Sequence, residues 1–107
     1  MDWKNKFEQE LGMADAARAR DNEGQARVCA RRAAGVVVRE YFLRMGRSPS
    51  SSSAYDLLND LLTMDVLPTR ARQAAEALTR RVTEEFKLPN ELDLVREARA
   101  LAACLLA

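Results

Sequence analysis

The sequence predicts an all-α protein: an up-and-down four-helix bundle with one additional short helix, five helices in total. Apolar residues recur at spacings of three and four along most of the chain, and no segment alternates as a strand does. Short clusters of Gly, Pro, Ser, Asn and Asp separate these segments, as is typical of connections between helices. The chain has 107 residues, enough for one domain and too few for two, so we expect a single helical domain over residues 1–107.

The first predicted helix covers residues 2–20. Asp2 is suited to cap its N-terminus, because a short carboxylate can accept a hydrogen bond from the free N–H groups of a first turn. Gly12 weakens this helix by about 1 kcal/mol relative to alanine, and we interpret it as a point of close approach by the second helix. The inward-facing residues are expected to be Trp3, Phe7, Leu11, Ala14 and Arg18.

Residues 24–46 form the central element, an Ala- and Arg-rich helix without proline. At 1.5 Å per residue it is roughly 33 Å long, the height of a small domain. The β-branched run 36–38 is a poor helix former, so packing has to override its propensity. Gly46 is predicted to close the helix. Its wide apolar stripe has two lines, one of Ala26, Cys29 or Ala30, Ala33, Val37 and Tyr41, the other of Val28, Gly35 or Val36, Phe42 and Leu43.

The serine-rich residues 47–53 are predicted to be a short solvated loop. Ser53, with Asp56 three residues on, resembles a capping box that opens a short helix from Ala54 to about Met64. The sequence Asp65-Val-Leu-Pro68 breaks this helix. Its buried side chains are expected to be Leu57, Leu58, Leu61 and Leu62.

The fourth helix is predicted from Thr69 to about Lys87, with Pro89 in the turn that ends it. Asn90 is expected to cap the last helix, with Asp93 in the N3 position. That helix reaches almost to Ala107 through Leu94, Val95, Ala98, Leu101, Ala102 and Leu105.

Composition excludes several activities. The chain contains no histidine, which removes Ser-His-Asp and Cys-His catalysis and His-ligated zinc. Asp56 and Asp60 share a helix face that could bind a hard cation, but a solvated face is the favoured interpretation. Cys29 and Cys104 lack metal or redox spacing and are expected to be buried small hydrophobic residues of a cytoplasmic protein, with a structural disulfide as the less favoured alternative. We expect no enzymatic activity, no metal, no cofactor and no membrane span, since no apolar run approaches the ~20 residues a span needs.

Charge is unevenly distributed although its formal net value is only +1. Between Arg18 and Arg47 there are eight arginines and only three acids. Arginine pairs with phosphate and carboxylate through two parallel hydrogen bonds, so the clusters on the second and fourth helices are candidate anion-binding or partner-binding sites. Nearby acids could instead neutralise most of these charges. The candidate residues are Arg27, Arg31, Arg32, Arg39, Arg80 and Arg81.

The order of these segments resembles the HEPN family of small helical bundles. The resemblance rests on ARVCARRAAGVVVREYFLRMG ending at Gly46, on AYDLLNDLL over residues 54–62, and on LTRRV, LPN and DLVREA over residues 78–98. Active HEPN ribonucleases carry an arginine followed within a few residues by histidine. Arg80 and Arg81 precede the comparable turn here, but the histidine is missing and Tyr55 stands where the short helix often begins with one. The resemblance therefore implies the bundle fold and a dimerising or partner-binding role without ribonuclease activity.

Two functional hypotheses follow. The first is a non-catalytic, HEPN-like protein-interaction module, acting as a homodimer or as the partner of another protein, such as a nucleotidyltransferase-type protein. The alternative is binding of nucleic acid or nucleotide phosphate through the arginine clusters on the second and fourth helices. The wide apolar stripe of the central helix favours the first hypothesis, and the local excess of arginine favours the second.

Overall fold

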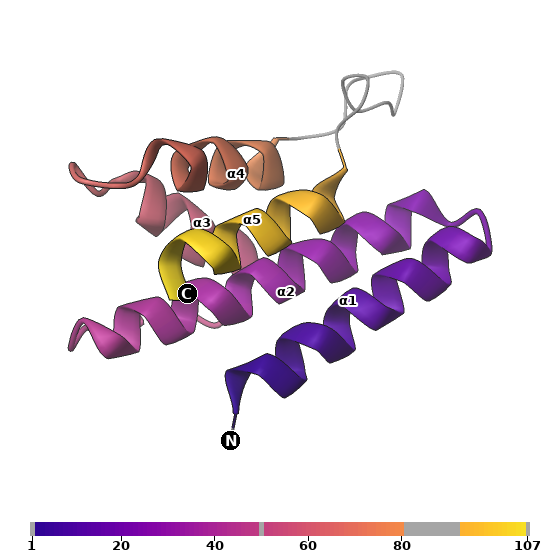
Figure 1. Ribbon diagram of the computed structural model, residues 1–107, viewed down its shortest axis with the longest axis horizontal. Coiled ribbons are helices and arrows are strands. Elements are labelled where there is room, and N and C mark those ends of the chain that lie inside the picture. The colour runs from indigo at the N-terminus through magenta and orange to yellow at the C-terminus, as the bar shows by residue number, and fades with distance from the viewer. Residues whose placement is uncertain (1, 50, 81–92, 107) are drawn as a thin grey trace.

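The computed structural model describes residues 2–49, 51–80 and 93–106 (Figure 1). These residues form helices and connecting turns and contain no strand, so the prediction of an all-α protein with five helices is confirmed for the described chain. The helices are α1 (Trp3–Ala19), α2 (Glu23–Arg44), α3 (Ala54–Leu62), α4 (Thr69–Thr79) and α5 (Leu94–Leu106).

Helix α2 is the central element, and it contacts each of the other four helices. Helix α1 lies antiparallel beside it, α5 crosses it on another side, and α3 and α4 pack beyond them (Figure 1). With 22 residues, α2 is about 33 Å long, most of the 39 Å longest dimension of the molecule. The long helix predicted from the sequence is therefore the one around which the others pack.

Arg20, Asp21 and Asn22 form the turn that ends α1 and begins α2. The N–H of Asp21 donates to the carbonyl oxygen of Arg18 (3.0 Å), and the N–H of Asn22 donates to that of Ala17 (2.8 Å). This pair of bonds is the Schellman motif, whose penultimate residue adopts a left-handed conformation; here that residue is Asp21, with φ 58°. The Asn22 side chain then accepts from the N–H of Gln25 (3.1 Å) and caps α2.

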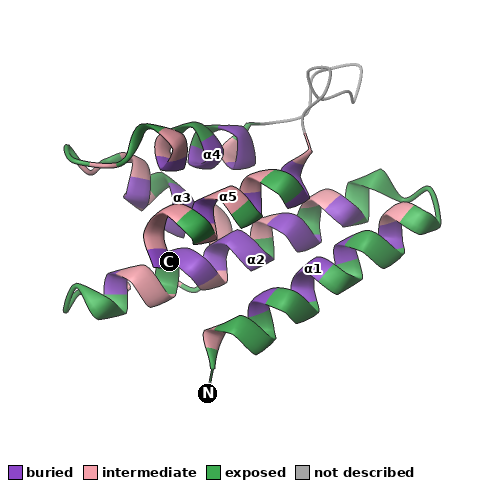
Figure 2. Cartoon of the chain, in the orientation of Figure 1, coloured by how far each residue is buried: buried purple, intermediate pink, exposed green. Residues whose placement is uncertain are grey.

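The core is a single cluster to which all five helices contribute (Figure 2). The β-branched run stays helical because Val37 and Val38 are fully buried in it, and this packing outweighs their weak propensity. The second apolar line expected on α2 is wrong at both ends, since Val28 is 39% exposed and Leu43 51% exposed. Between these ends, the α2 stripe is covered by helices of the same chain.

The sequence predicts a close helix approach at Gly12 and the end of the central helix at Gly46. The expectation that Gly12 marks a close approach is wrong, because a Cβ built there would meet nothing within 4 Å. The close approach occurs instead at Gly35, where a Cβ would lie 2.7 Å from the Cβ of Ala54. Gly46 closes α2 as predicted, with φ 76° and a hydrogen bond from its N–H to the carbonyl oxygen of Leu43 (3.1 Å).

The expected capping box at α3 is formed in a modified way. Ser53 accepts from the N–H of Asp56 (3.4 Å), as predicted. The Asp56 carboxylate, however, does not reach back to the N–H of Ser53. The hydroxyl of Ser51 lies between them, accepting from that N–H (3.0 Å) and donating to Asp56 Oδ2 (3.0 Å). An aspartate is one methylene shorter than the glutamate of a standard capping box, which is why a third residue completes the link.

The predicted boundaries of the last two helices need correction. Helix α4 ends at Thr79 rather than near Lys87, and Arg80 is extended with ψ 131°. At this end the Thr79 hydroxyl donates to the carbonyl oxygen of Ala75 (2.9 Å), one turn back in the helix. Residues 81–92, including Asn90, lie outside the described part. The observed cap of α5 is Asp93, whose Oδ1 accepts from the N–H groups of Val95 (3.1 Å) and Arg96 (3.3 Å).

Candidate functional site

The arginines of the described residues fall into two sets. One set has side-chain partners within the protein: Arg18, Arg31, Arg44, Arg47, Arg70, Arg72 and Arg99. In the other set, the guanidinium group has no hydrogen bond, ion pair or ring contact in the described part of the chain: Arg20, Arg27, Arg32, Arg39, Arg80 and Arg96. Arginines of the first set stabilise the fold, so a ligand site has to be sought among the second.

Arg31, a predicted binding residue, belongs to the first set. Its Nε donates to the carbonyl oxygen of Leu78 (2.7 Å) and its Nη2 to that of Arg80 (3.3 Å), across the packing of α2 against α4. The last carbonyl groups of a helix have no intrahelical partner, and Arg31 supplies one. Arg72 does the same for α3, donating to the carbonyl oxygens of Leu62 (3.2 Å) and Met64 (2.7 Å).

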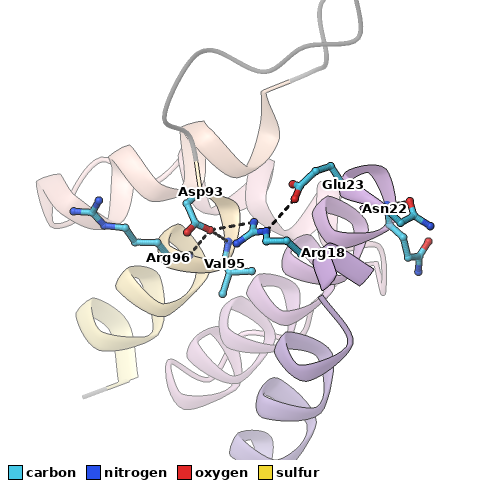
Figure 3. A network of polar contacts seen from close by, with 7 residues as sticks. Arg18, Asn22, Glu23, Asp93, Val95 and Arg96 are labelled. Carbon is cyan, nitrogen blue, oxygen red and sulfur yellow. Dashed lines mark hydrogen bonds and ion pairs between the residues drawn. The ribbon is translucent and has the colours of Figure 1, made fainter. Parts of the chain in front are cut away.

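Arg18 links three helices at one end of the molecule (Figure 3). Its Nε lies 3.1 Å from Glu23 Oε1 at the start of α2, and its Nη2 lies 3.3 Å from Asp93 Oδ1 at the start of α5. Partial burial by itself lowers the pKa of Arg18, but the charges and hydrogen bonds of Asp93 and Glu23 outweigh this effect and leave the pKa above its ordinary value. Asp93 is therefore both the cap of α5 and the partner of α1.

Helices α4 and α5 form a shallow hollow of about 460 Å³. Arg70 and Glu97 pair in it through two parallel hydrogen bonds of 2.8 and 2.9 Å. Arg80, another predicted binding residue, lines this hollow with Arg96 and Glu76. Three arginines and two glutamates line the hollow, so its net charge is only +1 (3 − 2).

Arg32 and Arg39, also predicted, line a larger cleft of about 640 Å³, called the arginine cleft below. They stand two turns apart on α2, and Gly35 lies between them. Helix α3 forms the opposite wall, which comes close because Gly35 has no side chain. The lining residues are Lys6 and Glu10 from α1, Arg32, Gly35, Val36 and Arg39 from α2, and Ser52, Ser53, Ala54 and Leu57 from the start of α3.

Glu10 is the residue that sequence reasoning missed. It is only 8% exposed, and its Oε2 is buried with no hydrogen-bond partner among the described residues. A buried carboxylate oxygen without a donor is costly, and such atoms are rare in native proteins. A signal was present in the sequence, since Glu10 falls between Phe7 and Leu11 on the apolar face of α1. A charged residue in a buried register is a reason to look for a site.

The structure therefore separates the predicted site residues. Arg32 and Arg39 share the arginine cleft, and Arg80 lies in the α4–α5 hollow. Arg31 donates to the carbonyl groups at the end of α4. Arg27 is half-buried and lines neither the arginine cleft nor the α4–α5 hollow, and Arg81 lies outside the described residues. Arg32 is exposed and pairs with neither Asp56, which accepts from Ser51, nor Glu97, which pairs with Arg70. No group of three potential metal ligands occurs among the described residues. Asp56 and Asp60, the pair that could bind a hard cation, therefore have no third ligand among these residues.

Comparisons with known proteins add no family. A scan against protein-family models and searches of curated proteins and of solved structures found no match. The resemblance to HEPN bundles, with its four-helix arrangement, therefore stays a prediction. Across the described residues, every helix is too short or too polar to cross a membrane.

Proposed function

We propose that this protein is a non-catalytic binding module and that the arginine cleft is its site for an anionic ligand. The observation that carries the proposal is the charge left unpaired there. Lys6, Arg32 and Arg39 contribute three positive charges and Glu10 one negative charge, which makes a net +2. In the described part of the chain neither arginine has an internal partner, so both guanidinium groups are available to a ligand.

The size and lining of the cleft support a small ligand. Its volume falls within the roughly 300–1,000 Å³ of small-molecule sites. No aromatic side chain is among the described residues that line it, so it offers no stacking platform for the bases of single-stranded nucleic acid. Among the ligands open to an arginine cluster, a discrete anion such as a phosphate group is therefore better supported than single-stranded nucleic acid.

The proposal is for binding because the lining offers cations, serine hydroxyls and one carboxylate. The chain has no histidine to act as a general base, and neither Cys29 nor Cys104 lines the cleft. The interaction-module hypothesis, with a homodimer or a nucleotidyltransferase-type partner, stays a prediction. Between its exposed ends at Val28 and Leu43, the motivating stripe on α2 is covered by helices of the same chain. Light scattering on the purified protein tests the hypothesis directly.

Titration calorimetry with inorganic phosphate at low salt tests the anion site. Arg32→Gln and Arg39→Gln are each expected to weaken phosphate binding by about 10-fold, because charge-assisted hydrogen bonds are stronger than neutral ones. Arg20→Gln is the matched control: it removes the same charge from an exposed arginine outside the cleft and is expected to leave the affinity unchanged. Equal affinity in the native protein and both cleft variants would contradict the proposal.

A further inference from the structure

We infer that the ligand of the arginine cleft is a phosphate monoester that also carries a hydroxyl group, the chemistry of a sugar phosphate. This inference rests on the proposed function, which requires only an anion. It adds the second group that the ligand must present, and that group is identified by the buried carboxylate of Glu10.

One oxygen of the Glu10 carboxylate lacks a hydrogen-bond donor among the described residues. Glu10 is one of the residues that line the cleft, its Oε2 is buried, and none of the described residues donates to that atom. The terminal torsion of a glutamate is broad and roughly two-fold, so rotation of the carboxylate exchanges its two oxygens and can turn the unpartnered one toward a donor in the cleft. A ligand donor placed beside α1 would thus supply the bond that the protein does not.

Charge balance identifies the anionic group and the donor. The cleft carries a net +2, from three cations and one carboxylate. A phosphate monoester carries about −1.5 to −2 at neutral pH and offsets this charge, whereas a carboxylate offsets only half of it. An ammonium donor at Glu10 would restore the excess of positive charge, so the donor is expected to be neutral. A hydroxyl fits this requirement and can also accept a hydrogen bond from Ser52 or Ser53 at the opposite wall.

The arrangement of the walls gives the ligand an orientation. Arg32 and Arg39 lie on α2, and the first turn of α3 lies opposite, with Ala54 at its N-terminus. The N-terminus of this nine-residue helix places partial positive charge beside the arginines, and Asp56 in its first turn offsets part of that charge. The phosphate is therefore placed between α2 and α3, and the hydroxyl is directed toward Glu10 on α1.

Calorimetry with three probes tests the inference: inorganic phosphate, ribose 5-phosphate and ribose. Ribose 5-phosphate is expected to bind the native protein at least about 10-fold more tightly than inorganic phosphate, since each 1.4 kcal/mol is a factor of ten. Ribose alone is expected not to bind. Adenosine monophosphate, which has a sugar phosphate and a base, forms a fourth arm: tighter binding than ribose 5-phosphate would support the same chemistry and identify a nucleotide as its source.

Two substitutions at Glu10 complete the experiment. Glu10→Leu keeps the side chain near its original size and removes the acceptor, so the preference for ribose 5-phosphate over phosphate is expected to vanish. The melting temperature is expected to rise, because a buried charge has been removed. Glu10→Gln keeps an uncharged acceptor and is expected to retain part of the preference.

The outcomes separate the two proposals. If ribose 5-phosphate and phosphate bind the native protein equally well, the inference is overturned and the anion site stands. If the preference survives in Glu10→Leu, the hydroxyl is not received by Glu10 and the inference is likewise overturned. If neither compound binds, the proposed function itself fails.

Discussion

Gly35 of α2 lies so close to Ala54 of α3 that a Cβ on the glycine would stand 2.7 Å from the alanine Cβ and 3.0 Å from its Cα. Distances below 3.0 Å between such atoms are not tolerated without movement. The absence of a side chain at residue 35 therefore sets how near the first turn of α3 can come to α2. Because both residues line the arginine cleft, the same contact determines its width.

Gly35→Ala is expected to destabilise the protein by about 1–3 kcal/mol, the usual penalty for an added methyl group in a tightly packed site. The atoms it would meet belong to the backbone and Cβ of Ala54, which cannot move aside as a flexible side-chain end can. Denaturation by urea, monitored by circular dichroism, measures the change. The double variant Gly35→Ala with Ala54→Gly is expected to recover part of the loss, and a single variant as stable as the native protein would show that α2 and α3 are not in close contact.

Gly12→Ala is expected to have the opposite effect and to stabilise the protein by up to about 1 kcal/mol. Gly12 lies in the exposed part of α1, and a Cβ there meets nothing within 4 Å. The gain comes from the lower entropy of the unfolded chain and the better helix propensity of alanine. The same urea titration measures it, and a loss of stability would mean that α1 has a neighbour at this position.

Asp21→Gly is expected to stabilise the turn between α1 and α2 by about 0.5–1 kcal/mol. Asp21 has φ 58°, in the left-handed region where a Cβ crowds the backbone, and glycine adopts that region freely. Its charge stands after α1 and before α2, so its interactions with the two helix dipoles oppose each other. Asp21→Ala is the control, since it removes the charge but keeps the Cβ; equal effects of the two substitutions would contradict the conformational explanation.

Arg31→Ala is expected to lower stability by about 2 kcal/mol, because two charge-assisted hydrogen bonds to the end of α4 are lost. Arg31→Lys keeps the charge but cannot make both bonds in the same geometry, so it is expected to recover only part of the loss. Arg32→Ala is the matched control: the next residue along α2 is exposed, and its removal is expected to change stability by less than about 0.5 kcal/mol. Equal losses at the two positions would show that Arg31 has no special structural role.

Much of the local structure could be predicted from the sequence. The caps at Asp2 and Ser53 and the glycine that ends α2 were identified from residue type and spacing alone. Each depends on hydrogen bonds between residues two to five positions apart, and such distances follow from helix geometry. The boundaries of α4 and α5 were less accessible, because the end of α4 involves Arg31 of another helix and Asp93 bonds to Arg18 of α1.

The sequence by itself determined that the protein is helical, which residues begin and end several helices, and that arginine is concentrated on α2. Only the tertiary structure decided what each arginine does. Arg31 and Arg32 are neighbours in sequence but point about 100° apart around the helix, so one reaches α4 and the other faces the arginine cleft. It likewise decided that Glu10 is buried and that its Oε2 has no hydrogen-bond partner among the described residues. Both outcomes depend on which helix lies opposite a side chain, and helical periodicity specifies the face a residue occupies but not what packs against it.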